Sequence, residues 1–272
     1  MMDLPVSDEV TTVITRYLSE VDSEAPGLVE GLYLVGSTAF GDYRPGQSDI
    51  DVVAVTAAPV DDDKHLSALA RAHESLRSAL PHPNLDGPYV TWEDLTQAPD
   101  LAGPGPYAHE GVYHPSGRFE LSPVTWEMLR QIAVPVRGPD PSTLGVWHDR
   151  AALTAWTRDN LNTYWRRWRD RGARLLSRSG LITLGPWAPG WAVFGVSRQH
   201  NVITTGEVIS KTAAGEYALR TFDERWHPIV RESLRLRGGR AGRREFLTPF
   251  ARRRALLDFI DMVIADATQR NS

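Results

Sequence analysis

The sequence predicts an α+β domain followed by an all-helical domain. Three observations predict this fold class. Residues 32–35 and 50–55 are apolar runs of strand length, and amphipathic stretches with helical spacing flank them. From about residue 147 onward the apolar spacing is helical almost throughout. We therefore expect a mixed sheet with flanking helices over residues 1–140 and a helical bundle over residues 141–272.

Each element of the first domain has its own signal. Residues 8–21 carry apolar side chains at helical spacing, with Ser7 as N-cap. A second helix is expected over residues 64–80. The acidic run 61–63 before it complements the helix dipole, although a metal site is the alternative. Residues 84–92 form a candidate third strand, and residues 97–115 are rich in Gly and Pro and predict a long loop.

A short helix over residues 124–133 precedes a Gly- and Pro-rich break at residues 137–142, where we place the domain boundary. Beyond it, the pattern predicts five helices, with Ser210 as an N-cap. Their expected ranges are 147–171, 191–203, 211–221, 228–236 and 249–267. The basic loop 235–244 is interpreted as a solvated, mobile linker, with an RNA or phosphate contact as the alternative.

The candidate site lies in residues 31–55. The first apolar run ends at Gly36-Ser37, and the second carries Asp49 and Asp51. Residues i and i+2 of a strand point to the same face, so the two carboxylates emerge together. Mg²⁺ is commonly held by one or two carboxylates and substrate phosphates, and a Gly-Ser turn suits close approach of a phosphate. These residues predict a site for a nucleoside triphosphate and magnesium.

Composition limits the partners and the cellular location that we expect. The net charge of −4 does not favour a general nucleic-acid binder, and no apolar run reaches 18 residues, so we expect neither a nucleic-acid partner nor a membrane span. The first residues lack the pattern of a secretion signal, and the chain contains no cysteine. We expect a cytoplasmic monomer.

The Gly-Ser turn followed by Asp-x-Asp resembles the signature of the polymerase-β-like nucleotidyltransferases. With the aromatic-rich helical half, the chain looks like the aminoglycoside (3″)(9) adenylyltransferases, which modify streptomycin and spectinomycin. The resemblance implies ATP as co-substrate and Mg²⁺ held by Asp49 and Asp51, with Gly36, Ser37 and Ser48 at the phosphates.

That family also carries a third acid, a Glu on the strand after the second helix. Asp86 occupies the matching position without a gap, so the resemblance implies that Asp86 is the catalytic base and a third metal ligand. Its side chain is one methylene shorter. Alternatively, Asp86 starts a turn with Gly87-Pro88, and Glu93 is then the reserve candidate.

A second specific segment spans residues 197–211, where Arg198, Thr205-Gly206 and Ser210-Lys211 keep the family's spacing. The resemblance implies that Arg198 and Lys211 contact the ATP phosphates across the interdomain cleft. Cations there stabilise the departing pyrophosphate. The alternatives are an interdomain salt bridge for Arg198 and an exposed lysine in the first turn for Lys211.

The acceptor is less well defined. Streptomycin-modifying members carry an acid ten residues before the Arg, where this chain has Ala188, so spectinomycin is favoured over streptomycin. Two alternatives remain. The enzyme modifies a hydroxyl of a protein, an RNA or another small molecule, or the chain is a non-catalytic homologue that binds a nucleotide or a drug. Four aromatic residues of the long helix form either bundle core or an acceptor pocket: Trp156, Tyr164, Trp165 and Trp168.

Overall fold

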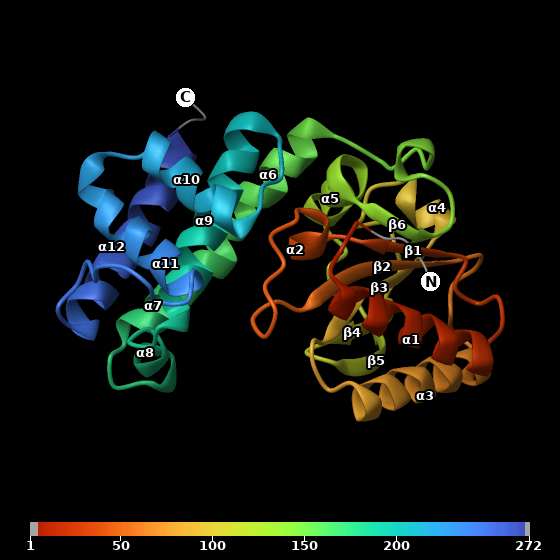
Figure 1. Cartoon of the computed structure of the whole chain (residues 1–272). Helices are drawn as coiled ribbons and strands as arrows, with labels where there is room; N and C mark the ends of the chain where they lie inside the picture. Colours follow the sequence, from red (N-terminus) through yellow and green to blue (C-terminus); the bar gives the residue numbers. More distant parts are fainter. Residues whose placement is uncertain (1–4, 270–272) are drawn as a thin grey trace. The chain divides into compact units, whose positions relative to one another are not determined.

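The computed structural model describes residues 5–269 and divides into two compact units, Met1–Asp149 and Arg150–Ser272 (Figure 1). The first unit is α+β and the second is helical, as the sequence predicts. The division follows Asp149, whereas the sequence placed the boundary after residue 140.

The first unit is built on a six-stranded mixed sheet in the order β5-β4-β3-β2-β1-β6. Only the central pair β2 and β3 is parallel, and the other neighbours are antiparallel. The strands are β1 (Gly31–Leu34), β2 (Ile50–Thr56), β3 (Leu85–Thr91), β4 (Gly105–His109), β5 (Val112–Gly117) and β6 (Val134–Arg137).

Both faces of this sheet are covered, which explains the nearly continuous apolar runs of its central strands. The helices of the unit are α1 (Asp8–Glu24), α2 (Gly36–Ala39), α3 (Asp63–Ala79), α4 (Trp92–Leu95) and α5 (Pro123–Ile132). Leu34 and Val52 belong to a core with α1 and α3, whereas Tyr33 and Val53 belong to a second core with Trp126 of α5. Successive residues thus alternate between the two cores, as the pleat requires.

The predicted helix starts of this unit are confirmed. The Ser7 side chain accepts a hydrogen bond from the Val10 amide, and that of Asp62 accepts one from the His65 amide. The acidic run before α3 therefore caps this helix, as expected.

The predicted loop over residues 97–115 is wrong in its second half. Strands β4 and β5 form a hairpin there, in which His109 pairs with Val112 across the two-residue turn Glu110-Gly111. Both turn residues have positive φ, 51° and 70°, as a type I′ turn requires. Strand β6 was also missed. It is anchored by Arg137, whose guanidinium donates to both carboxylate oxygens of Asp22 at 2.8 and 2.6 Å.

The second unit is a bundle of helices around α9. Its five predicted helices are confirmed with shifts of up to four residues at their ends, and the short helix Arg178–Ile182 was missed. The predicted helix 147–171 is one continuous helix in three parts, with a π-helical segment, Leu161–Trp165, between α6 (Arg150–Asn160) and α7 (Arg166–Ala173). The remaining helices are α8 (Arg178–Ile182), α9 (Trp187–Thr205), α10 (Lys211–Thr221), α11 (His227–Arg237) and α12 (Pro249–Gln269).

Helix α9 is buried along most of its length and is tied to its neighbours by His200. The Nδ1 atom of this buried side chain lies 2.6 Å from the Tyr217 hydroxyl of α10, and Nε2 lies 2.7 Å from Asp266 of α12. The helix ends at Gly206, whose φ of 81° is left-handed, as helix C-caps favour.

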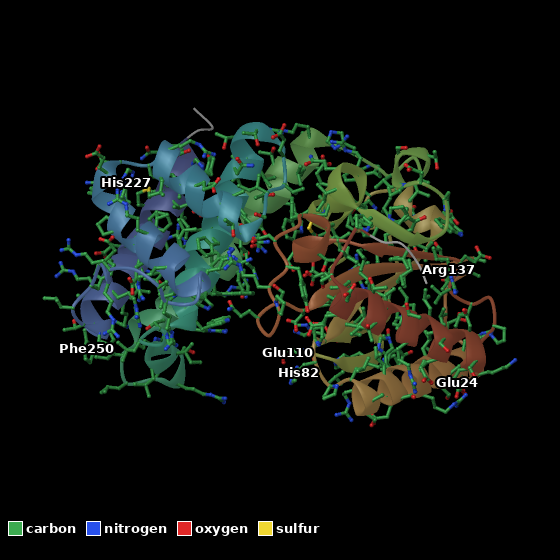
Figure 2. The ribbon with its side chains drawn as sticks, in the orientation of Figure 1. Glu24, His82, Glu110, Arg137, His227 and Phe250 are labelled. Carbon is green, nitrogen blue, oxygen red and sulfur yellow. The ribbon has the colours of Figure 1, made fainter. Side chains whose placement is uncertain are left out.

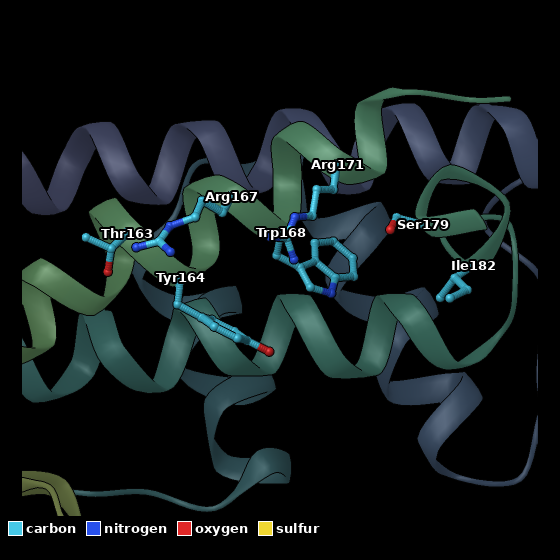
Figure 3. Close-up of a pocket in the computed structure, with 7 residues that line it drawn as sticks. All are labelled: Thr163, Tyr164, Arg167, Trp168, Arg171, Ser179 and Ile182. Carbon is cyan, nitrogen blue, oxygen red and sulfur yellow. The ribbon is translucent and has the colours of Figure 1, made fainter. Parts of the chain in front are cut away.

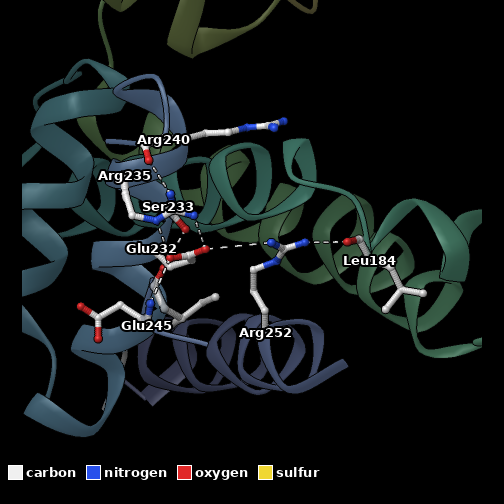
Figure 4. A network of polar contacts seen from close by, with 8 residues as sticks. Leu184, Glu232, Ser233, Arg235, Arg240, Glu245 and Arg252 are labelled. Carbon is white, nitrogen blue, oxygen red and sulfur yellow. Dashed lines mark hydrogen bonds and ion pairs between the residues drawn. The ribbon is translucent and has the colours of Figure 1, made fainter. Parts of the chain in front are cut away.

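The basic loop between α11 and α12 is attached to the bundle at both ends (Figure 4). The buried carboxylate of Glu232 accepts hydrogen bonds from Arg235 at 2.8 and 2.9 Å and lies 4.0 Å from Arg252. Arg235 also donates to the backbone oxygen of Arg240 at 2.8 Å. The Glu245 amide also donates to Glu232 at 3.3 Å. Glu232 therefore holds both ends of the loop, while the Arg243 and Arg244 side chains are exposed.

The four aromatic residues of the long helix serve different purposes. Trp165 is 4% exposed and belongs to the bundle core, and Trp168 packs against that core. Trp156 and Tyr164 are 36% and 45% exposed. The core interpretation therefore holds for Trp165. Among the helices of residues 5–269, none is both long and apolar enough to cross a membrane.

A buried polar network joins α1, α3 and β3 on the face of the sheet that α1 and α3 cover. The Tyr17 and Tyr89 hydroxyls lie 2.5 Å apart, and His73 Nε2 lies 2.8 Å from the Tyr89 hydroxyl. Burial lowers the pKa of His73 from 6.5 to about 4. His73 is therefore neutral in the folded protein at neutral pH.

This shift predicts an acid-dependent loss of stability. Between pH 6.5 and 4 the unfolded chain binds a proton at His73 that the folded protein does not, so the free energy of unfolding falls with decreasing pH. The slope is about 1.4 kcal/mol per pH unit. We expect His73→Gln to flatten this slope in urea titrations. An unchanged slope would contradict the assignment.

Candidate functional site

The site begins where β1 ends and α2 starts. The Val35 amide donates to the Asp51 carbonyl at 2.9 Å, which places the end of β1 beside the start of β2. The next residue, Gly36, has a φ of 58°, and a Cβ atom there would lie 2.0 Å from Asp51 Oδ2. The Asp51 carboxylate thus packs directly on the Gly36 backbone. Only glycine allows both this conformation and this approach.

The three predicted acids gather at one end of the parallel pair β2–β3. Asp51 and Asp86 are register partners on the two strands, so their side chains project from the same face of neighbouring strands about 4.8 Å apart. Asp49 precedes β2 by one residue, and its negative charge contributes to raising the pKa of Asp86. The strand register thus places Asp51 next to Asp86, and Asp49 is close enough to act on Asp86 electrostatically.

Asp86 is the buried member of the group, with 6% of its surface exposed. Its Oδ2 accepts a hydrogen bond from the Glu110 amide at 2.9 Å, and Oδ1 accepts one from the Gly111 amide at 3.0 Å. Burial raises the pKa of Asp86, and the two amides and His109, 3.8 Å away, act in the opposite direction. The hairpin turn, in which Glu110 is labelled in Figure 2, therefore holds the Asp86 carboxylate in place.

Two alternatives from the sequence are wrong. Asp86 does not begin a turn with Gly87-Pro88, because all three residues lie within β3. Gly87 is required by packing instead, since a Cβ atom there would lie 1.9 Å from the Val52 carbonyl oxygen. Glu93 lies in α4, beyond the far end of the seven-residue β3, roughly 20 Å along the chain from Asp86. It is exposed and lies beyond the opposite end of β3 from Asp86.

The two predicted phosphate-binding serines differ in their surroundings. Ser37 is in the first turn of α2, and its hydroxyl makes no hydrogen bond to any residue that the structure describes. The Ser48 hydroxyl accepts a hydrogen bond from the Arg44 amide at 3.1 Å within the loop before β2. Ser37 is therefore oriented by its helix, and Ser48 also stabilises its own loop.

The acids fit a magnesium ion held by two carboxylates. Within residues 5–269, no group of three or more His, Asp or Glu side chains is arranged to hold a metal ion. Both oxygens of Asp86 already accept an amide hydrogen. Asp49 and Asp51 would supply carboxylate oxygens, which Mg²⁺ commonly combines with water and phosphate oxygens in its coordination shell. The role of Asp86 as a third ligand stays a prediction.

Arg198 and Lys211 belong to the second unit. Arg198 lies on α9 and is half-buried, and Lys211 is the first residue of α10, capped by the Ser210 side chain. The Lys211 Nζ atom lies 5.9 Å from the centroid of the Trp191 ring. The predicted helix–turn–helix form of this segment is confirmed, including the glycine at its turn. The contact of these two cations with a nucleotide stays a prediction.

Sequence reasoning missed the amide donors of Glu110 and Gly111. Their only local signal is a Glu-Gly pair between short apolar stretches, which is weaker than the Asn-Gly or Asp-Gly of typical two-residue hairpins. The complementary signal, the buried Asp86, lies more than twenty residues earlier in the chain.

Comparisons with known proteins find a matching domain model and a matching fold. Residues 14–85 match the family model described as Nucleotidyltransferase domain. No curated protein matches the chain. A solved structure, spectinomycin adenyltransferase AAD(9) from Enterococcus faecialis with ATP and spectinomycin, matches with a TM-score of 0.63 at 12% identity. The match covers 92% of this chain and 99% of that one.

The matched residues contain Gly36, Ser37, Asp49 and Asp51, and they end just before Asp86. The domain match supports a nucleotidyltransferase enzyme, and the structural match confirms the predicted fold over both units.

The contact between Gly36 and Asp51 yields a direct prediction. Gly36→Ala forces the Asp51 carboxylate to move, so we expect binding of ATP in the presence of Mg²⁺ to weaken by about tenfold or more. Gly41→Ala is the matched control, because Gly41 also has a positive φ, 65°, but has open space around it. Isothermal titration calorimetry measures both. Equal losses in the two variants would trace the effect to backbone strain and contradict the contact.

Proposed function

We propose that this nucleotidyltransferase transfers AMP from ATP to a hydroxyl group of an aminoglycoside or aminocyclitol antibiotic and releases pyrophosphate. The observation that carries the proposal is the register pairing of Asp51 with Asp86, beside Asp49 and the Gly36-Ser37 turn. All of these residues except Asp86, which directly follows the match, lie in the stretch that matches a nucleotidyltransferase domain. The fold shared with an adenylyltransferase that binds ATP and spectinomycin supports it.

The residues take distinct parts in this reaction. The backbone at Gly36 and the hydroxyls of Ser37 and Ser48 bind the triphosphate oxygens. Asp86 accepts the proton of the acceptor hydroxyl, whose oxygen then attacks the α-phosphorus as the bond to the β-phosphate oxygen breaks. The raised pKa of Asp86, which burial causes, makes it a stronger base than an exposed aspartate.

Asp49 and Asp51 are the residues that would hold magnesium. When bound there, Mg²⁺ neutralises the charge of the phosphates and of the departing pyrophosphate. Because both carboxylates are negatively charged, they also keep the triphosphate tail from approaching without a counter-ion.

The acceptor is spectinomycin in preference to streptomycin. Ala188 stands where the streptomycin-modifying relatives have an acid, and its side chain is fully buried in the core of the helical unit. It therefore offers neither a charge nor an exposed surface to a polycation. A smaller aminocyclitol needs fewer carboxylates, which is consistent with the spectinomycin bound by the structural relative.

Pyrophosphate release from ATP and Mg²⁺ tests the proposal. We expect release with spectinomycin, little with streptomycin, and a loss of about 10²-fold or more in Asp49→Asn and in Asp86→Asn. The new product carries the added mass of AMP. Binding of ATP without release on either drug would contradict the antibiotic assignment, and AMP found on a protein or RNA would identify a different acceptor.

Arg198 and Lys211 have a separate prediction. If they stabilise the phosphates, Arg198→Ala and Lys211→Ala each lower kcat/KM for ATP by about tenfold or more, since each removes a charge-assisted contact. Lys64→Ala, which removes the other lysine of the chain, is the control. Unchanged kinetics with both substitutions would assign Arg198 and Lys211 to structural roles.

A further inference from the structure

The helical unit contains a cavity of its own, of about 310 Å³ (Figure 3). One wall is a single stretch of helix that contributes Tyr164, Arg167, Trp168 and Arg171. The other end is closed by Ser179 and Ile182 of α8. This volume is at the small end of the range for ligand pockets. It accommodates a molecule of one or two rings.

The π-helical segment shapes this cavity. It turns Trp165 into the bundle core, where the absence of a side chain at Gly195 makes room: a Cβ atom there would lie 2.1 Å from the Trp165 ring. The preceding residue, Tyr164, then lies at the surface and lines the cavity. Short π-helical turns inside α-helices frequently occur at functional sites because they redirect side chains in this way.

The charge of the cavity is one-sided. Arg167 and Arg171 are one helical turn apart, and neither guanidinium has an ion pair or hydrogen bond to the part of the chain that the structure describes. Arg169, between them, is by contrast paired with Asp261 at 2.5 Å and with Asp170 at 3.3 Å. Among the described residues, no carboxylate lines the cavity.

The side chains that line the cavity indicate the charge and the shape of a ligand that would bind there. Two guanidinium groups repel a cation and offer paired donors to a carboxylate. The half-buried Trp168 ring and the Tyr164 ring offer flat faces on which a second ring stacks. Ser179 and Thr163 add hydroxyls at opposite ends.

We infer that this cavity, formed by Arg167, Arg171, Trp168 and Tyr164 within the helical unit, binds a small aromatic carboxylate. The site is distinct in charge from one for an aminocyclitol cation, and the inference does not depend on the proposed transfer of AMP.

Indole-3-acetate and tryptamine are matched probes, because they share the indole ring and carry opposite charges. In calorimetric titrations of the full chain, we expect indole-3-acetate to bind at least tenfold more tightly than tryptamine. The double variant Arg167→Gln/Arg171→Gln should weaken indole-3-acetate binding by about tenfold or more. Trp168→Leu should weaken binding of the same probe through loss of stacking.

Arg166→Gln is the control variant. Arg166 is an exposed arginine of the same helix that donates to Asn162 at 3.2 Å and does not line the cavity. It should bind indole-3-acetate like the unaltered chain, and unchanged thermal melting of all variants excludes a loss of folding. Equal affinity for the two probes, no binding of indole-3-acetate, or binding that survives the double substitution would each overturn the inference.

Discussion

The contact between the Gly36 backbone and the Asp51 carboxylate is the constraint on which the candidate site depends. It requires a residue without a side chain at the end of β1, a left-handed backbone there, and β2 adjacent to β1 at Asp51. The parallel register of β2 and β3 then places Asp86 beside Asp51. One turn, one strand pair and one hairpin therefore determine where the negative charge is concentrated.

Most of the fold could be predicted because its signals are local. The strands β1 and β2 are buried on both faces and read as nearly continuous apolar runs. The helices have clear caps, such as Ser7 and Ser210. Strand β6 could not be predicted in this way. It is a four-residue edge strand that contains a proline and is held by the ion pair of Arg137 with Asp22, far away in the sequence.

The position of the candidate site residues could be predicted only where it depends on local sequence. Gly36, Asp49 and Asp51 lie within one short stretch, where spacing alone places them near one another. The environment of Asp86 depends instead on a hairpin within residues 97–115, where the Gly- and Pro-rich composition predicted a loop. The amides of Glu110 and Gly111 reach Asp86 only in the folded sheet, so no local pattern records that contact.

A structure of the protein with Mn²⁺ and a non-hydrolysable ATP analogue tests whether Asp49 and Asp51 form the metal site, because anomalous scattering locates manganese without ambiguity. We expect manganese coordinated by carboxylate oxygens of Asp49 and Asp51, with the triphosphate against Gly36 and Ser37. Manganese elsewhere, or a nucleotide bound away from this turn, would contradict it.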